Sequence, residues 1–103
     1  MSKFNSLQVA DVVRETPEAV SVAFNVPEQF KNDYTFKQGQ YLTLKFKING
    51  EELRRSYSIC SSYYENELRV AVKKVKDGRV STHIFNTLKK GDVIEVMTPM
   101  GNF

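Results

Sequence analysis

The sequence predicts a small all-β domain in which six short strands form an antiparallel barrel with one helix. Two observations lead to this prediction. Hydrophobic residues recur at every second position through most of the chain, which is the period of a strand with one buried face. Turn-forming residues interrupt this pattern at short intervals, so the strands are short and tightly connected. A flat sheet of this size would expose its edges, whereas closure into a barrel covers them.

The alternating pattern occurs in six segments. These are residues 7–15, 20–26, 42–48, 51–59, 68–72 and 93–97. In the first segment the alternation slips near Asp11, which predicts a bulge or a bend. Asn49 and Gly50 separate the third segment from the fourth, and both residues accept positive φ, so a tight hairpin is expected there. Periodicity alone leaves the order of the strands in the sheet open.

One segment has the pattern of a full helix. Ser81 is a good N-cap, and the apolar residues Ile84 and Leu88 that follow it lie on one face. Gly91 is a suitable stop for this helix. We therefore expect a helix that begins near Ser81, and a single helical turn at residues 28–32.

Composition limits the class of protein. The chain of 103 residues is long enough for one domain, residues 1–103, and its net charge of +3 fits an anionic ligand without implying nucleic acid. Its one cysteine, Cys60, excludes an internal disulfide, a four-cysteine metal site and an iron–sulfur cluster held by this chain. No apolar run is long enough for a signal peptide or a membrane span, so we expect a cytoplasmic protein.

A first polar cluster lies on the strand after the hairpin. Arg55 and Tyr57 share one face of that strand, so a guanidinium group and a phenol ring point the same way. A guanidinium group binds phosphate through two parallel hydrogen bonds, and a phenol ring is flat enough to lie against a heterocycle. The neighbouring Ser58 adds a hydroxyl group. These residues would suit a ligand with a flat ring and a pyrophosphate; the alternative is a surface strand with solvated charges.

A second cluster, residues 78–81, lies at the start of the expected helix. The unpaired N–H groups of a helix N-terminus and the helix dipole favour an anion. Gly78 would allow a ligand to approach the backbone closely, and Ser81 would cap the helix or reach an oxygen of that ligand. The alternative is a hairpin glycine followed by an ordinary capped helix.

Four short segments resemble, in this order, the motifs of the ferredoxin–NADP reductase superfamily. They are residues 36–41 (G-Q-F/Y), 55–58 (R-x-Y-S/T), 78–81 (G-x-x-S) and 99–103 (P-x-G-x-F). The superfamily implies a Greek-key barrel that binds FAD. Residues 55–62 and 68–81 are most similar to the branch of reductases that serves phenylacetyl-CoA epoxidases in phenylacetate degradation.

The resemblance implies roles for the first cluster. Arg55 would bind the FAD pyrophosphate, and Tyr57 would lie against the isoalloxazine ring. Ser58 would form a hydrogen bond near N5, the atom that accepts hydride, so Tyr57 and Ser58 are the residues expected at the catalytic centre. Strict alternation places Ser58 on the face opposite Tyr57, and this role therefore requires a bend at the strand end.

For the second cluster the resemblance implies that Gly78, Val80 and Ser81 hold the pyrophosphate, largely through backbone N–H groups. Val72 and Lys73, on the preceding strand, would contact the flavin or its ribityl chain, mainly through their backbone. No metal site is implied. Residues of both clusters would then surround one FAD molecule.

The resemblance also implies an activity. The protein would be an NAD(P)H-dependent flavin oxidoreductase that passes electrons from NADH or NADPH through FAD to an iron–sulfur centre or an oxygenase component. A nicotinamide-binding domain and a 2Fe–2S domain have no counterpart in this sequence, so we expect them elsewhere in a longer reductase whose N-terminal part this is. Two alternatives remain: a small barrel that binds single-stranded nucleic acid, and a cofactor-free interaction module.

Overall fold

The computed structural model describes residues 3–61 and 67–101 of the chain. This part of the chain contains six strands, a short 3-10 helix and one α-helix. They are β1 (Phe4–Thr16), β2 (Ala19–Asn25), η1 (Glu28–Phe30), β3 (Tyr41–Ile48), β4 (Glu51–Ser58), β5 (Leu68–Lys73), α1 (Arg79–Thr87) and β6 (Val93–Met97). Each expected strand is present close to its expected position, and η1 is the expected helical turn.

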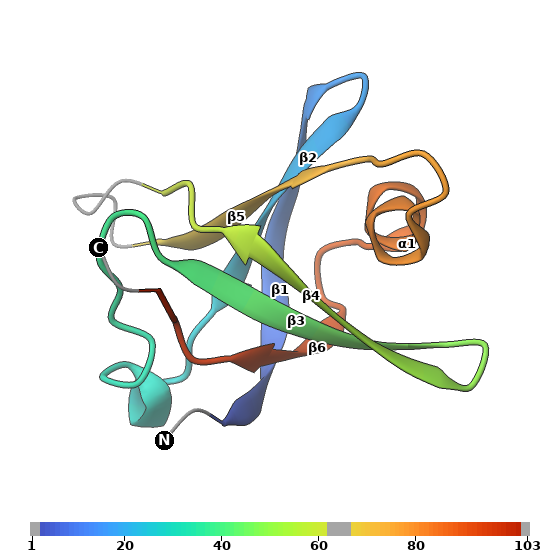
Figure 1. The fold of residues 1–103 in the computed structure, drawn as a ribbon. Helices are drawn as coiled ribbons and strands as arrows, with labels where there is room; N and C mark the ends of the chain where they lie inside the picture. Colours follow the sequence, from blue (N-terminus) through green and yellow to red (C-terminus); the bar gives the residue numbers. More distant parts are fainter. Residues whose placement is uncertain (1–2, 62–66, 102–103) are drawn as a thin grey trace.

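All strand pairs are antiparallel, and the order in the sheet is β4-β3-β6-β1-β2-β5. The last strand, β6, lies between β3 and β1, which makes the sheet a Greek key. The two end strands meet where Ile59, just beyond β4, bridges Val70 of β5. From there β4 and β5 diverge, and α1 lies on the side where they have separated (Figure 1). The predicted antiparallel barrel with one helix is confirmed.

Two local predictions are also confirmed. Asn49 and Gly50 form the β3–β4 turn with φ of 52° and 80°, as expected for a tight hairpin. The register between β1 and β2 shifts between Val9 and Asp11, which is the expected bulge.

The core consists of apolar side chains from the inner faces of the strands and from α1. Leu7, Val22, Leu42, Leu44, Val70, Val72, Ile84 and Val96 are fully buried. Burial of one such side chain stabilises the fold by about 1.5–3 kcal/mol. The rings of His83 on α1 and Phe46 on β3 also pack edge to face, with their centroids 5.6 Å apart. These contacts fix α1 against the barrel.

The helix begins two residues earlier than Ser81, because Gly78 is its N-cap residue. The Ser81 hydroxyl accepts a hydrogen bond from the Val75 N–H at 3.1 Å and donates to the Gly78 carbonyl at 3.4 Å. It therefore stabilises the turn that leads into the helix. The helix ends at Thr87, before the expected stop, and Gly91, with φ of 98°, lies in the turn that follows.

A polar network joins β1, β2 and β5. The guanidinium group of Arg69, 16% exposed, donates to Ser21 Oγ at 2.6 Å and to Asp11 Oδ2 at 2.8 Å, and it also pairs with Glu67. The Ser21 hydroxyl donates to Glu15 Oε2 at 2.8 Å. Burial lowers the pKa of Arg69, but the hydrogen bonds and charges of Asp11 and Glu67 outweigh this effect and raise it. The network explains why Ser21, on the polar side of the alternating pattern, is buried.

We predict that Arg69→Ala lowers the free energy of unfolding by about 1–3 kcal/mol, because the Asp11 carboxylate and the buried Ser21 hydroxyl lose their partner. Urea unfolding followed by circular dichroism measures the change. Arg54→Ala is the control: it removes an exposed ion pair with Glu52 (3.1 Å) and should cost less than about 1 kcal/mol. Equal losses of unfolding free energy in the two variants would mean that the network stabilises the fold no more than a surface ion pair does.

Candidate functional site

The residues predicted for the site lie on three elements around the place where β4 and β5 diverge. Arg55, Tyr57 and Ser58 lie on β4, Val72 and Lys73 end β5, and Gly78, Val80 and Ser81 lie at the start of α1. The Ile59–Val70 bridge joins these elements at one end. At the other end Arg79 Nη1 lies 2.9 Å from Glu51 Oε1, which joins α1 to the β3–β4 turn. We call the parts of β4, β5 and α1 between these two contacts the frame.

One face of β4 passes from the core into the frame. Alternation places Leu53, Arg55 and Tyr57 on this face, and the register with β3 is unbroken. Leu53 is buried, Arg55 is exposed, and Tyr57 is half-buried and packs against the core, so Arg55 is the residue of this face that is open to solvent. Burial raises the pKa of Tyr57, although the nearby Arg55 charge partly offsets this, and the phenol is therefore neutral at pH 7.

Arg55 has no carboxylate partner among the residues that the structure describes. Its Nη1 donates only to the neighbouring Arg54 carbonyl at 2.7 Å. Arg54, on the opposite face, is in contrast paired with Glu52 at 3.1 Å, and its guanidinium group lies 5.0 Å from the centre of the Phe4 ring. The charge of Arg55 is thus available to an anionic ligand, whereas that of Arg54 is already compensated.

Ser58 faces the frame with its backbone. β4 pairs with β3 without a register shift from Glu51 to Ser58, so no bulge interrupts the ladder and alternation keeps the Ser58 side chain opposite Tyr57. In an antiparallel pair, successive residues direct their N–H groups to opposite sides. Since the Ile59 N–H donates to the Gln40 carbonyl, on the β3 side, at 3.0 Å, the Ser58 N–H points away from β3 and towards the frame.

The start of α1 offers backbone N–H groups. The first helical hydrogen bond runs from the Thr82 N–H to the Gly78 carbonyl at 3.0 Å, so the N–H groups of residues 79–81 precede it. A Cβ at Gly78 would lie 2.7 Å from Ser81 Oγ and 3.0 Å from the Val75 carbonyl oxygen. Glycine is therefore required here by the close approach of its own chain. Both hydrogen bonds of the Ser81 hydroxyl lie within this turn. The groups left to contact a ligand at the helix start are therefore backbone N–H groups.

The two β5 residues differ in exposure. Val72 is fully buried and pairs with Val20 of β2, so its side chain belongs to the core. Lys73 is exposed at the end of the strand and pairs with Ala19. Val72 therefore has only its backbone for contact with a ligand in the frame; the backbone roles that the resemblance implies for both residues stay a prediction.

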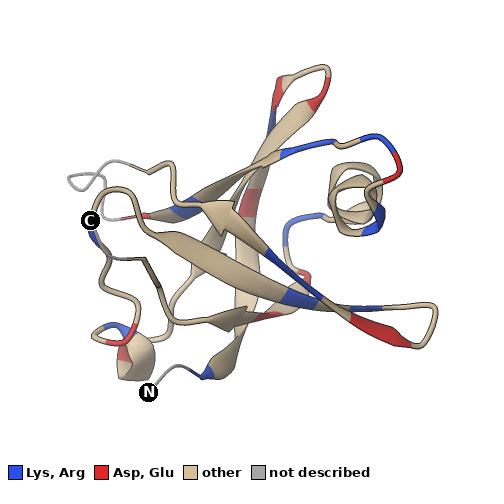
Figure 2. Ribbon diagram, viewed as in Figure 1, with Lys and Arg blue, Asp and Glu red and all other residues tan. Residues whose placement is uncertain are grey.

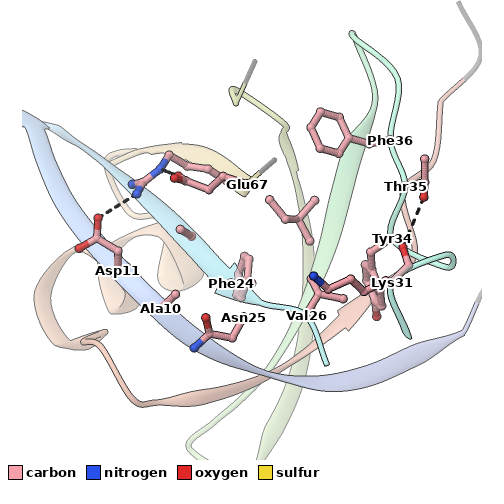
Figure 3. A pocket seen from close by; sticks show the side chains of 13 residues that line it. Ala10, Asp11, Phe24, Asn25, Val26, Lys31, Tyr34, Thr35, Phe36 and Glu67 are labelled. Atoms are coloured by element: carbon pink, nitrogen blue, oxygen red, sulfur yellow. Dashed lines mark hydrogen bonds and ion pairs between the residues drawn. The ribbon is translucent and has the colours of Figure 1, made fainter. Parts of the chain in front are cut away.

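A separate hollow of about 730 Å³ lies outside the frame, and none of the predicted site residues lines it. Asp11 and Arg69 of the polar network line one part of it, and Phe24, Tyr34 and Phe36 line another (Figure 3). Among residues 3–61 and 67–101, no group of histidine, cysteine and acidic side chains could hold a metal ion. No helix in this part of the chain is long and apolar enough to cross a membrane.

The fold and the frame together define a class of protein: a Greek-key barrel in which an uncompensated guanidinium group and a neutral phenol ring lie beside a helix N-terminus. The chain belongs to the oxidoreductase FAD-binding domain family, whose model matches residues 6–103. FAD is the cofactor of this family of domains. Membership supports the flavin interpretation of the two clusters over nucleic-acid binding or a cofactor-free module.

Similar proteins share this domain and are longer. The chain is 48% identical, over all 103 residues, to a 1,2-phenylacetyl-CoA epoxidase component from Escherichia coli strain K12, of which it spans 29%. A ferredoxin NADP+ reductase from Neisseria gonorrhoeae with bound FAD and NADP matches with a TM-score of 0.79 and 29% identity, over 97% of this chain and 39% of that one. Phthalate dioxygenase reductase matches with a TM-score of 0.76 and 28% identity, over 97% of this chain and 30% of that one.

Sequence reasoning missed one contact of the frame, the ion pair between Glu51 and Arg79. Both residues belong to segments that the sequence marks, because Glu51 follows the Asn49–Gly50 turn and Arg79 stands within the second cluster. Their pairing depends on how α1 packs against the β3–β4 hairpin, and no local pattern carries that information.

We predict that Gly78→Ala lowers the free energy of unfolding by about 1–3 kcal/mol, because the new methyl group would overlap the Ser81 hydroxyl. Urea unfolding measures the change. In a Ser81→Ala background the same substitution should lower the free energy of unfolding by a smaller amount, since the Ser81 hydroxyl oxygen, the nearest overlapping atom, is absent. Additive losses in the double variant would show that Ser81 is not the reason for glycine at this position.

Proposed function

We propose that residues 1–103 form the FAD-binding domain of a longer NAD(P)H-dependent oxidoreductase, which passes electrons from NADH or NADPH through FAD to an iron–sulfur centre or an oxygenase component. Family membership supports the cofactor. The length of the relatives supports further domains, since the chain spans 29–39% of the three described above. Phthalate dioxygenase reductase supports the direction of transfer, because it is described as a modular structure for electron transfer from pyridine nucleotides to 2Fe–2S.

The single observation that carries the proposal is the Arg55 guanidinium group on the frame, which has no carboxylate partner within residues 3–61 and 67–101. The FAD pyrophosphate carries negative charge, and a guanidinium group binds phosphate oxygens through charge-assisted hydrogen bonds. In this proposal Val80 and Ser81 contribute N–H groups and the positive end of the helix dipole to the same phosphates. The Gly78 N–H donates to the Val75 carbonyl at 2.8 Å, so Gly78 contributes by shaping the turn that presents these groups. The half-buried ring of Tyr57 would lie against the isoalloxazine, and burial raises the pKa of its phenol further above the ordinary value.

FAD, when bound, accepts a hydride at N5 and passes on electrons singly; the protein orients the ring and tunes its environment. Ser58 would donate its backbone N–H to the polar edge of the ring near N5, because this group points into the frame. Val72 and Lys73 would contact the flavin or its ribityl chain through their backbone. None of these groups would act as a general acid or base.

The identity of 48% to the phenylacetyl-CoA epoxidase component exceeds the 28–29% found for the two reductases described above. We therefore include in the proposal that the electron acceptor is an oxygenase component of that kind, in phenylacetate degradation. A nicotinamide-binding domain and a 2Fe–2S domain of the same protein would supply the steps before and after the flavin. A cytoplasmic location fits this role, because NADH and NADPH are available there.

We predict that Arg55→Ala weakens FAD binding by roughly 10- to 150-fold, which corresponds to the loss of about 1.5–3 kcal/mol from charge-assisted hydrogen bonds. Titration with FAD, followed by flavin absorbance or fluorescence, measures the affinity. Arg54→Ala is the matched control, because this neighbour lies on the opposite face and is paired with Glu52. If both variants bind FAD equally well, Arg55 is not part of the site.

We predict that Ser58→Ala leaves the rate of flavin reduction by NADH within about threefold of the wild type in the full-length protein, since the backbone N–H remains. Ser58→Pro removes this N–H and should slow reduction much more. Proline is tolerated on an edge strand where the N–H does not pair with the neighbouring strand, so the fold should persist, which circular dichroism checks. A large effect of Ser58→Ala in stopped-flow measurements would assign the role to the hydroxyl instead.

A further inference from the structure

The contact between Glu51 and Arg79 lies at the end of the frame opposite the Ile59–Val70 bridge. Arg79 is the first residue of α1, and its Nη1 lies 2.9 Å from Glu51 Oε1 in the first position of β4. Alternation places Glu51 on the same face of β4 as Arg55 and Tyr57. This face of β4 and the start of α1 therefore present two guanidinium groups, Arg55 and Arg79, and one carboxylate, Glu51, which is paired with Arg79. Figure 2 shows this acidic β3–β4 turn opposite the basic start of α1.

We infer that Glu51 is a built-in competitor for phosphate: its carboxylate holds Arg79 in the protein without ligand, and a phosphate group of the bound ligand takes its place. This inference rests on the proposed function, because the phosphate would be that of FAD. Arg79 would then bind phosphate alongside the N–H groups of the helix start. Glu51 would lower the affinity for FAD, both by occupying Arg79 and by repelling the ligand's negative charge.

The exposure of the two side chains makes such an exchange feasible. The Arg79 and Glu51 side chains are 46% and 59% exposed, and an ion pair with that much access to water is weak. A guanidinium group gains more from two parallel hydrogen bonds to phosphate than from one exposed contact with a carboxylate. Arg79 is also at the helix N-terminus, where the dipole favours an anion over the cation that stands there. A phosphate group could therefore replace Glu51 as the partner of Arg79.

The same strand provides a matched control. Glu52 pairs with Arg54 at 3.1 Å, and both of these side chains are 55% exposed, so this pair resembles the first in kind and exposure. Glu52 lies on the opposite face of β4, away from the frame. A change at Glu52 therefore removes a similar negative charge from the same turn without releasing a guanidinium group into the frame.

The test is a titration of the full chain with FAD, and with riboflavin, which has the same ring and no phosphate. Glu51→Gln should bind FAD roughly two- to tenfold more tightly than the wild type. The gain should shrink between about 0.01 M and about 1 M salt, where the Debye length falls from about 30 Å to about 3 Å. Glu52→Gln should bind FAD like the wild type, and Glu51→Gln should leave riboflavin binding unchanged. Circular dichroism confirms that each variant is folded.

Arg79→Gln should weaken FAD binding, and in this background Glu51→Gln should give a smaller gain, because no guanidinium group is released. The inference is overturned if Glu51→Gln weakens FAD binding, which would make the pair a support for α1, or if it tightens riboflavin to the same extent as FAD. These outcomes are separate from a failure of the proposed function, which would appear as a folded wild-type chain that does not bind FAD.

Discussion

Closure of the barrel at one place, between Ile59 and Val70, is the constraint on which the rest of the structure depends. β4 and β5 are the two ends of the sheet, and in the described part of the chain they form no continuous ladder. If β4 and β5 paired along their whole length, the Ser58 N–H would donate a hydrogen bond to β5. The inner face of β4 would then be covered by core side chains. Because they diverge instead, that face changes along its length from the buried Leu53 to the exposed Arg55. The candidate site lies along the stretch where these two strands diverge.

The start of α1 depends on the same geometry. The helix packs into the barrel through Val80 and Ile84, and this fixes its N-terminus beside the separated ends of β4 and β5. The turn before it is held by the Ser81 hydroxyl, for which Gly78 leaves room. Packing of the core thus orients the backbone groups of the site, so the fold and the site share the same residues.

The strands were predictable because their pattern is local: the apolar Leu42, Leu44 and Phe46 recur at every second position, all three are buried, and they mark β3 by themselves. Three features could not be predicted from the sequence, because each depends on residues far apart in the chain. They are the strand order, the burial of Ser21 and the Glu51–Arg79 contact. The position of the site came from resemblance to known motifs, which record tertiary arrangement that periodicity does not contain. Ser58 shows the limit of such motifs, because they mark the residue without saying whether its hydroxyl or its backbone acts.

The position of β6 has a consequence for how the molecule assembles. β1–β2 and β3–β4 are hairpins of neighbouring segments and form from local contacts, but β6 alone lies between β3 and β1 and joins them. Until residues 93–97 have left the ribosome, the edges of β1 and β3 that pair with β6 therefore remain unpaired. Exposed edges of this kind are where chains aggregate, and loops between distant partners close slowly. A nascent chain of this protein is thus most vulnerable just before its last strand emerges.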